Sequence, residues 1–305
     1  MKSELRPEGK PRTSGVIVTY RPVQDELLRL VDAIRPQVDE LFIVDNGNGT
    51  EIPEVLRQSD IKVICLGDNY GIACAQNIGI RDALSGGSHF VLLLDQDSVP
   101  QADMVARLIE AYEQLVGHGV RVAAVGPSYI DERQGEIAPF VYRDGLKLKR
   151  RHRKADAKVS ETDFLIASGC LIAREAFSDI GMMEEGLFID YVDIEWGLRA
   201  RQLGFRSFGV HDAMMTHSLG DEWIEFRGRR VPVHSPLRHY YHSRNAIWLA
   251  KRPWIGWPWR LILLQRLVLQ FLFFGVFAQH RLDHIRKMSL GFWHGLTGRS
   301  GRLET

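Results

Sequence analysis

The sequence predicts an α/β fold built on an open, mostly parallel twisted sheet with helices on both faces. Between residues 15 and 94, short apolar runs rich in β-branched residues alternate with longer stretches of helical periodicity. The 305 residues are 45% apolar and 25% charged, which suits one large or two modest domains and excludes a disordered chain or a disulfide scaffold. Ligands of such sheets bind at the carboxyl ends of the strands, so the residues after each apolar run are the first site candidates.

Local patterns place the individual elements. Short apolar runs predict strands at residues 16–20, 41–44, 62–66, 90–94 and 122–125. Leu27, Leu28, Val31 and Ile34 recur at steps of three and four and end before Pro36, which predicts a helix. Further helices are expected at 102–116 and 175–180, and one is expected to begin near residue 193.

Residues 146–158 are unusually basic, with seven Lys or Arg and one Asp. A solvated loop is the favoured interpretation, and a contact to an anionic lipid or acceptor is the alternative.

Charge is distributed unevenly along the chain. The formal net charge is +1, but residues 201–305 contain 16 basic and 6 acidic residues. The same third contains the apolar run 261–278, and apolar bulk combined with positive charge is typical of surfaces that contact anionic membranes. We therefore expect a membrane surface rather than a nucleic acid as partner.

The cysteines and the N-terminal segment predict the compartment. Cys65, Cys74 and Cys170 are odd in number, lie in apolar surroundings and show no C-x-x-C spacing, so they are expected to be small core residues. Residues 1–13 are polar and lack the apolar core of a secretory signal. These observations predict a cytoplasmic protein.

Asp95 and Asp97 directly follow the apolar run 90–94. Residues two apart in an extended chain point the same way, so both carboxylates can face one cleft. Two such carboxylates repel unless a cation lies between them, and Mg²⁺ or Mn²⁺ prefers carboxylates together with substrate phosphates. The alternative is a turn that caps the next helix.

Residues 67–79 are rich in small side chains across a loop and the start of a helix. Small residues allow a ligand to approach the backbone closely, and a helix N-terminus attracts anions. Asn69 and Asn77 are the candidates there to contact substrate. Close packing of the helix against the sheet would explain the small residues equally well.

A dense polar cluster follows at residues 190–199. Asp190, Asp193 and Glu195 lie near the start of an expected helix, with Trp196 and Arg199 beside them. A carboxylate that is partly buried there can accept a proton, whereas helix capping is the competing explanation.

His217 is a candidate metal or diphosphate ligand, with a structural, hydrogen-bonded histidine as the alternative. No G-x-G-x-x-G follows the first strand, and neither a Walker A sequence nor a G-x-S-x-G elbow is present. The sequence therefore lacks the main motifs of a dinucleotide-dependent dehydrogenase and of a serine hydrolase.

Taken in order, these motifs resemble family-2 glycosyltransferases of the GT-A fold, and within them bacterial rhamnosyltransferases. The resemblance spans roughly residues 14–300. It is carried by residues 16–20, 42–47, 69–71 with 77–79, 93–98, 168–172, 188–196, 217–220 and 238–245.

The resemblance implies a metal-dependent, inverting transfer of a sugar from a nucleoside diphosphate, with Mg²⁺ or Mn²⁺ as cofactor. Thr19, Tyr20 and Asp45 would bind the base and ribose. Asp95 with Gln96 would contact the donor, while Asp97 and His217 would hold the metal and diphosphate.

The family's Glu-Asp motif supplies the general base through its second residue. Val192 and Asp193 stand in that place, so the glutamate is absent and Asp193 is the expected base. Asp190 and Glu195 are candidates to compensate. The residues expected to contact the acceptor or support the catalytic groups are Asp190, Glu195, Trp196, Arg199 and Arg244.

The chain divides into a flexible segment 1–13, a catalytic domain 14–245 and a helical extension 246–305. The longest uncharged stretch after Arg266 is 13 residues, about 20 Å as a helix, whereas a bilayer core needs about 30 Å. Three nearby tryptophans and flanking basic residues suggest a helix lying in the membrane interface. A buried helix and an oligomer contact are the alternatives.

The expected function is transfer of L-rhamnose from dTDP-L-rhamnose to a saccharide, either free or lipid-linked, in surface polysaccharide synthesis at the inner face of the membrane. The donor sugar rests on the resemblance alone. A sugar nucleotidyltransferase is one alternative, although residues 19–22 lack the glycine-rich basic turn that holds a triphosphate. A catalytically inert nucleotide-binding or membrane-adaptor protein is another.

Overall fold

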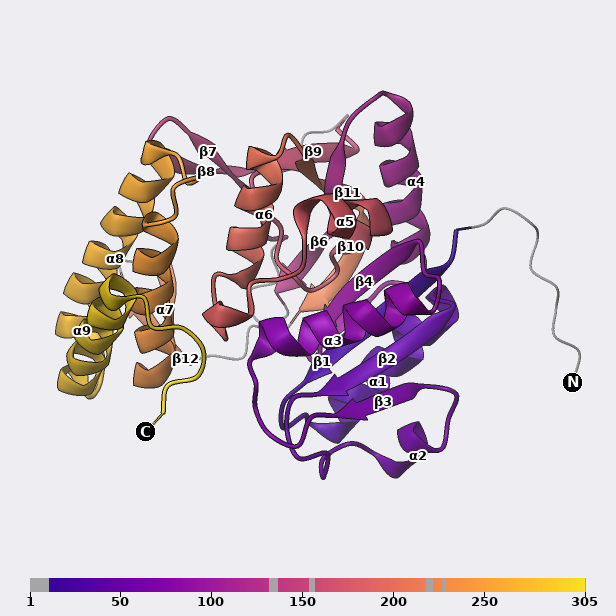
Figure 1. The fold of residues 1–305 in the computed structure, drawn as a ribbon, viewed down its shortest axis with the longest axis horizontal. Coiled ribbons are helices and arrows are strands. Elements are labelled where there is room, and N and C mark those ends of the chain that lie inside the picture. The colour runs from indigo at the N-terminus through magenta and orange to yellow at the C-terminus, as the bar shows by residue number, and fades with distance from the viewer. Residues whose placement is uncertain (1–10, 132–136, 154–156, 218–221, 227–228, 305) are drawn as a thin grey trace, which may run out of the picture.

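The computed structural model describes residues 11–131, 137–153, 157–217, 222–226 and 229–304. Its centre is a nine-stranded sheet in the order β3-β2-β1-β4-β10-β6-β11-β5, with β9 paired to β11 (Figure 1). The strands of this sheet are β1 (Thr13–Thr19), β2 (Glu40–Asp45), β3 (Lys62–Cys65), β4 (Phe90–Asp95), β5 (Ser98–Pro100), β6 (Val122–Asp131), β9 (Val159–Thr162), β10 (Leu171–Ala173) and β11 (Arg206–His217).

The sheet is mixed in its pairings, but six of its nine strands run in the same direction, as predicted for a mostly parallel sheet. Strands β3, β2, β1 and β4 are parallel neighbours, and β6 is parallel to β11. The short strand β10 runs antiparallel to both β4 and β6, so it joins these two groups. Strands β5 and β9 are antiparallel to β11.

Helices cover both faces of the sheet, as predicted from the alternation of elements. They are α1 (Gln24–Ile34), α2 (Glu54–Arg57), α3 (Ile72–Ser85), α4 (Met104–Gly117), α5 (Arg174–Ile180), α6 (Val192–Gln202), α7 (Pro236–Ala250), α8 (Trp257–Phe277) and α9 (Arg281–Thr297), with short 3₁₀ turns at Arg35–Gln37 and Glu185–Leu187.

Alternate strand residues enter two separate cores. Ile17 and Ile43 pack with the apolar faces of α1 and α4, whereas Val16 and Val44 pack with α3, α5 and α6 on the opposite face. Ala246 of α7 and Leu263 of α8 belong to the second core. The C-terminal helices are therefore joined to the sheet through shared apolar packing.

Close helix-to-sheet packing explains one of the glycines in the region 67–79. A Cβ at Gly79 would lie 2.4 Å from a methyl carbon of Val16. The absence of a side chain at Gly79 lets α3 lie directly on β1 and β2. This outcome matches the packing alternative rather than a ligand contact.

Within the basic segment 146–158, Lys147–Arg151 forms a strand rather than a loop, whereas residues 154–156 lie outside the described part of the chain. Strands β7 (Phe140–Asp144) and β8 (Lys147–Arg151) form an antiparallel hairpin. The hairpin forms because Phe140 and Leu148 pack against the second core while the basic side chains remain outside it. A second hairpin consists of β12 (Glu222–Phe226) and β13 (Arg229–Val233).

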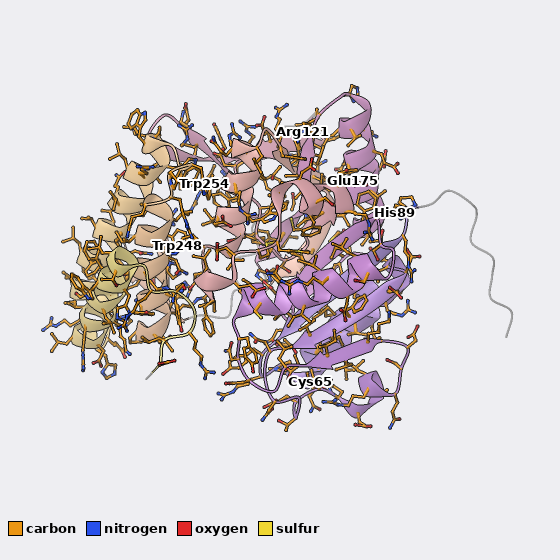
Figure 2. The ribbon with its side chains drawn as sticks, in the orientation of Figure 1. Cys65, His89, Arg121, Glu175, Trp248 and Trp254 are labelled. Carbon is orange, nitrogen blue, oxygen red and sulfur yellow. The ribbon has the colours of Figure 1, made fainter. Side chains whose placement is uncertain are left out.

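The cysteine prediction holds for Cys170 but not for Cys65. Cys170 is buried, and its burial raises the pKa of the thiol to about 12. Cys74 is half-buried. Cys65 is exposed because it ends β3, the edge strand of the sheet, where the guanidinium of Arg57 contacts its sulfur at 3.6 Å (Figure 2).

The C-terminal helices α7, α8 and α9 stand together beside α6 (Figure 1). The predicted boundary between a catalytic domain 14–245 and an extension 246–305 falls inside helix α7, which runs continuously through residue 245. The division into these two parts remains a prediction. Among the described residues, α8 is the one helix long and apolar enough, by length and composition, to cross a membrane. Its buried residues are Trp259, Ile262, Leu263, Leu267 and Phe274, so one face packs on the protein.

Candidate active site

The D-x-D segment lies at the end of β4, and β5 pairs it with a distant strand. Asp95 is the last residue of β4, and Ser98 is opposite His217 in the antiparallel pair of β5 and β11. This pairing brings His217 to Asp97 across the sequence, with 3.3 Å between His217 Nδ1 and Asp97 Oδ1. Strand pairing thus assembles the two acids and the histidine that the sequence predicted as donor and metal ligands.

Two serines orient this cluster. The Ser98 hydroxyl lies 2.8 Å from His217 Nδ1 and 2.6 Å from the Ser168 hydroxyl. The backbone N–H of Asp95 donates to Ser168 Oγ at 3.0 Å. Ser98 and Ser168 are both buried, so the histidine ring and the end of β4 are held in one arrangement.

The cluster has the chemistry of a divalent cation site. One ligand atom from each of Asp95, Asp97 and His217 lies within 4.8 Å of the others. Burial raises the pKa of Asp95 to about 6, with repulsion from Asp97 adding to the effect and the charges of His217 and Arg238 opposing it. Asp97 Oδ1 is buried, with His217 as its ion-pair partner. A cation would relieve this repulsion, and carboxylates with one imidazole suit Mn²⁺ or Mg²⁺.

The predicted nucleotide-binding residues lie at the neighbouring strand ends. Asp45 is buried, and its carboxylate accepts hydrogen bonds from Thr19 Oγ1 at 2.9 Å and from the Gly49 N–H at 2.7 Å. The Tyr20 N–H donates to Gln96 Oε1 at 2.8 Å, which ties the loop after β1 to the D-x-D segment. Tyr20 is 43% exposed, and the guanidinium carbon of Arg21 lies 5.3 Å from the centroid of its ring.

Asn69 shapes the loop before α3. Its Oδ1 accepts from Asn46 Nδ2 and from the Gly71 N–H, each at 3.0 Å. Gly71 has φ +91°, and a Cβ there would lie 2.5 Å from the carbonyl oxygen of Phe188. The tight fit allows the N–H of Ile72 to donate to that carbonyl at 2.7 Å, which joins the start of α3 to the loop before α6.

Asn77 does not lie in this site. It is buried, its Nδ2 donates to the Met183 carbonyl and to Glu185 Oε1, and its Oδ1 accepts from the Met183 N–H. The prediction that Asn77 contacts substrate is therefore replaced by a structural role, because its amide is already used to bind residues 183–185.

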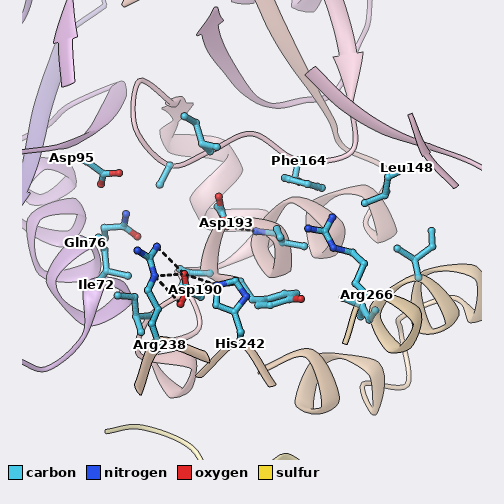
Figure 3. Close-up of a pocket in the computed structure, with 18 of the residues that line it drawn as sticks. Ile72, Gln76, Asp95, Leu148, Phe164, Asp190, Asp193, Arg238, His242 and Arg266 are labelled. Atoms are coloured by element: carbon cyan, nitrogen blue, oxygen red, sulfur yellow. Dashed lines mark hydrogen bonds and ion pairs between the residues drawn. The ribbon is translucent and has the colours of Figure 1, made fainter. Parts of the chain in front are cut away.

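A cavity of about 340 Å³ connects the cation cluster to the C-terminal helices (Figure 3). Asp95 and His217 line one part of it, and Asp193 lies at the first turn of α6. The other lining residues come from several elements, namely Ile72, Gln76, Tyr129, Leu148, Phe164, Ile166, Ala167, Ile189, Asp190, Tyr191, Val192, Ile194, Arg238, His242, Trp259, Ile262, Leu263 and Arg266.

Asp193 has the properties of a general base. Its pKa is raised to about 6, chiefly by burial and also by the negative charges of Asp190 and Asp95, while the backbone N–H groups of Ile194 and Asp193 itself oppose the shift. The Ile194 N–H donates to Asp193 Oδ1 at 2.8 Å. A carboxylate with a raised pKa accepts a proton more readily near neutral pH than an ordinary aspartate.

The pKa of Asp190 is shifted in the opposite direction. Arg238 donates to its carboxylate with distances of 3.1 and 3.2 Å, and His242 Nε2 lies 3.3 Å from Oδ1. Although burial opposes ionisation, His242 and Arg238 hold the pKa of Asp190 well below its usual range. Asp190 therefore stays charged and supports the basicity of Asp193.

The loop that carries Asp190 has a backbone that non-glycine residues rarely adopt. Phe188, Asp190 and Tyr191 have φ values of 65°, 61° and 66°. Asn245 Nδ2 of α7 lies 3.0, 2.8 and 3.0 Å from the carbonyl oxygens of Leu187, Ile189 and Asp190. These contacts offset the cost of the left-handed conformations.

Four residues predicted near the acceptor bind the protein itself. Glu195 and Arg199 form a pair at 2.8 Å, and Arg199 also binds the carbonyls of Ile180 and Met182. Trp196 Nε1 donates to the Gly181 carbonyl at 2.8 Å. These three residues do not line the cavity of about 340 Å³, although Trp196 shares a smaller cavity with Asp193. Of the two predicted roles, contact with the acceptor or support of the catalytic groups, their positions fit the second. That Glu195 compensates for the missing glutamate stays a prediction.

Arg244 is the fourth residue predicted near the acceptor that binds the protein itself. It is only 1% exposed and donates to the carbonyl of Leu187 at 2.7 Å and to Asn245 Oδ1 at 2.9 Å. It supports the loop before α6 and does not reach the cavity.

Sequence reasoning missed Arg238, His242, Trp259 and Arg266 as cavity residues. The i, i+4 spacing of Arg238 and His242 places both on one face of α7, which was the available signal. The sequence pattern instead places Trp259 and Arg266 in the segment expected to lie in the membrane interface.

The sequence model described as glycosyl transferase family 2 matches residues 14–181. The chain belongs to this family. It is 31% identical over 293 residues to the dTDP-rhamnosyl transferase RfbF of Shigella flexneri, covering 94% of this chain and 96% of that protein. It is 24% identical over 271 residues to the N-acetylglucosaminyl-diphospho-decaprenol L-rhamnosyltransferase of Mycobacterium tuberculosis strain H37Rv, covering 80% of this chain and 85% of that protein.

The fold matches solved structures as well. The crystal structure of GalNAc-T7 with UDP, GalNAc and Mn²⁺ aligns with a TM-score of 0.58 and 16% identity, covering 95% of this chain and 58% of that chain. The protein is thus a rhamnosyltransferase-like glycosyltransferase with the predicted GT-A fold.

We expect Asn77→Ala to weaken folding rather than donor binding. The change leaves the Met183 N–H and carbonyl without their partner, which costs about 1–3 kcal/mol in the free energy of unfolding. Urea unfolding and the KM for the donor measure the two effects. A raised donor KM with unchanged unfolding would return Asn77 to the site.

Proposed function

We propose that the protein transfers L-rhamnose from dTDP-L-rhamnose to a hydroxyl of a lipid-linked saccharide, in one inverting displacement. The observation that carries the proposal is one cavity that holds both a cation-competent cluster and a buried carboxylate with raised pKa, Asp193. The printed names of the Shigella and Mycobacterium relatives support rhamnose and, for the second, a lipid-linked acceptor.

The two parts of the cavity have different roles in the proposed reaction: Asp193 accepts the proton, and the cation cluster faces the negative charge of the leaving diphosphate. The acceptor oxygen forms a bond to the anomeric carbon of the donor, and the bond from that carbon to the diphosphate oxygen breaks with its electron pair. Asp193 takes the acceptor's proton. Mg²⁺ or Mn²⁺ held by Asp95, Asp97 and His217 would offset the charge on the departing nucleoside diphosphate.

The exposed face of α8 supports a peripheral position on the cytoplasmic membrane surface. It carries exposed apolar side chains at Leu261, Leu264, Val268, Leu269, Leu272 and Val276. Arg281 and Arg286 follow on α9 and are also exposed. Apolar side chains with adjacent cations favour the interface of an anionic bilayer, which would bring a lipid-linked acceptor to the cavity.

The donor is tested by release of nucleoside diphosphate from dTDP-L-rhamnose, dTDP-glucose, UDP-glucose and GDP-mannose, with lipid-linked N-acetylglucosamine as acceptor. We expect release from dTDP-L-rhamnose with Mg²⁺ or Mn²⁺ and none with EDTA, because the leaving charge needs the cation. Release from another donor would contradict the proposal that rhamnose is transferred. Undiminished release in EDTA would contradict the proposed dependence on a divalent cation.

Asp193→Asn should lower kcat about 10²- to 10⁴-fold with little change in the donor KM, because the amide cannot accept the proton. In the unsubstituted protein, activity should fall as the pH drops below about 6, since protonation removes the base. The residual rate of the variant should not show this pH dependence. Exposed Asp32→Asn is the control, and equal losses in both variants would exclude Asp193 as base.

Flotation with vesicles containing anionic phospholipid tests the membrane position. We expect the double variant Leu269→Glu and Leu272→Glu to reduce binding at least about tenfold, because burying a leucine contributes about 1.5–3 kcal/mol. Leu203→Glu, at an exposed leucine directly after α6, is the control. Binding that is equal in both variants would argue against this face of α8.

A further inference from the structure

Arg266 is directed into the cavity by the periodicity of α8. Trp259, Ile262, Leu263 and Arg266 follow one another at steps of three, one and three, which places them on one face of the helix. All four line the cavity, and Figure 3 shows the Arg266 side chain extending from α8 into it. The exposed leucines and valines of α8 occupy the opposite face.

The two arginines of the cavity differ in their partners. Arg238 binds the carboxylate of Asp190. Arg266 makes no hydrogen bond or ion pair within the described part of the chain, and Leu148, Phe164 and Trp259 line the cavity with it. A guanidinium with five donors beside apolar walls is suited to bind an anionic group of a ligand.

The position of Arg266 indicates that the anionic group it is suited to bind belongs to the acceptor. In Figure 3, Asp193 lies between Asp95 on one side and Arg266 on the other. An inverting displacement places the leaving diphosphate and the attacking hydroxyl on opposite sides of the anomeric carbon. The leaving diphosphate belongs with the cation cluster at Asp95, so Arg266 lies on the side from which the acceptor attacks.

We infer that Arg266 binds the diphosphate of an acceptor in which the saccharide is joined to a lipid through that diphosphate. This inference rests on the proposed function, takes the diphosphate link from the printed name of the Mycobacterium relative, and adds the residue that recognises it. The sugar hydroxyl lies at Asp193, the diphosphate at Arg266, and the first part of the lipid against Trp259, Ile262 and Leu263. The hydrocarbon then leaves along α8, whose outer face is apolar.

The test compares two acceptors with one lipid. N-acetylglucosamine is joined to farnesol through a diphosphate in one and by a direct glycosidic bond in the other. We expect Arg266→Gln to raise the KM of the diphosphate acceptor about 10- to 100-fold, since a charge-assisted hydrogen bond is lost. The KM values of the donor and of the uncharged acceptor should not change.

Two further variants separate charge from packing. Arg266→Lys keeps a positive charge and should restore part of the affinity, whereas Arg29→Gln, at an exposed arginine of α1, removes a cation outside the cavity and should have no effect. A raised donor KM in Arg266→Gln would overturn the inference. Equal effects on both acceptors would overturn it as well, because they would indicate packing.

Binding without turnover separates this inference from the proposed function. Calorimetric titration with farnesyl diphosphate, farnesol and inorganic diphosphate needs no donor sugar. We expect Arg266→Gln to lose affinity for farnesyl diphosphate and to bind farnesol unchanged. If these binding results are obtained but the protein transfers no rhamnose, the role of Arg266 in binding the acceptor stands and the proposed donor is overturned. Equal binding of inorganic and farnesyl diphosphate would overturn the lipid part of the inference.

Discussion

The contact of the Asn245 amide with the loop before α6 is the constraint on which the catalytic arrangement depends. Three non-glycine residues of this loop, Phe188, Asp190 and Tyr191, are in the left-handed region of φ. Each such residue costs on the order of 1 kcal/mol or more, so the loop needs compensating contacts. Asn245 supplies them at three carbonyls, and the Ile72 N–H binds a fourth. Asp193 follows this loop directly and takes its position from it.

Helix α7 connects this constraint to the electrostatics of the cavity. Its C-terminal half carries Arg244 and Asn245, which hold the loop, and its N-terminal half carries Arg238 and His242, which pair with Asp190. The paired carboxylate stays ionised, and its charge helps to raise the pKa of Asp193. One helix therefore sets both the place and the basicity of the expected base, and helices α7 and α8 line the cavity of the candidate active site.

The site is assembled from two parts of the molecule with different chemistry. The sheet edge contributes Asp95, Asp97 and His217, a set of hard ligands suited to a cation and a diphosphate. Helices α6, α7 and α8 contribute a largely apolar chamber with Asp193 and Arg266. Helix α8 belongs to the cavity through one face and presents apolar residues outward through the other. This arrangement suits an acceptor that is part sugar and part lipid.

The sequence by itself determined the alternation of strands and helices and the positions of Asp95, Asp97 and Asp193 at element ends, because short-range periodicity encodes both. It did not determine which polar residues face the cavity. Asn77, Glu195, Arg199 and Arg244 have the same local polarity as true site residues, yet they bind backbone groups inside the protein. Only the tertiary structure decided this, and only it placed Arg266 in the same cavity as Asp193, because contacts between residues far apart in the chain depend on how whole elements pack.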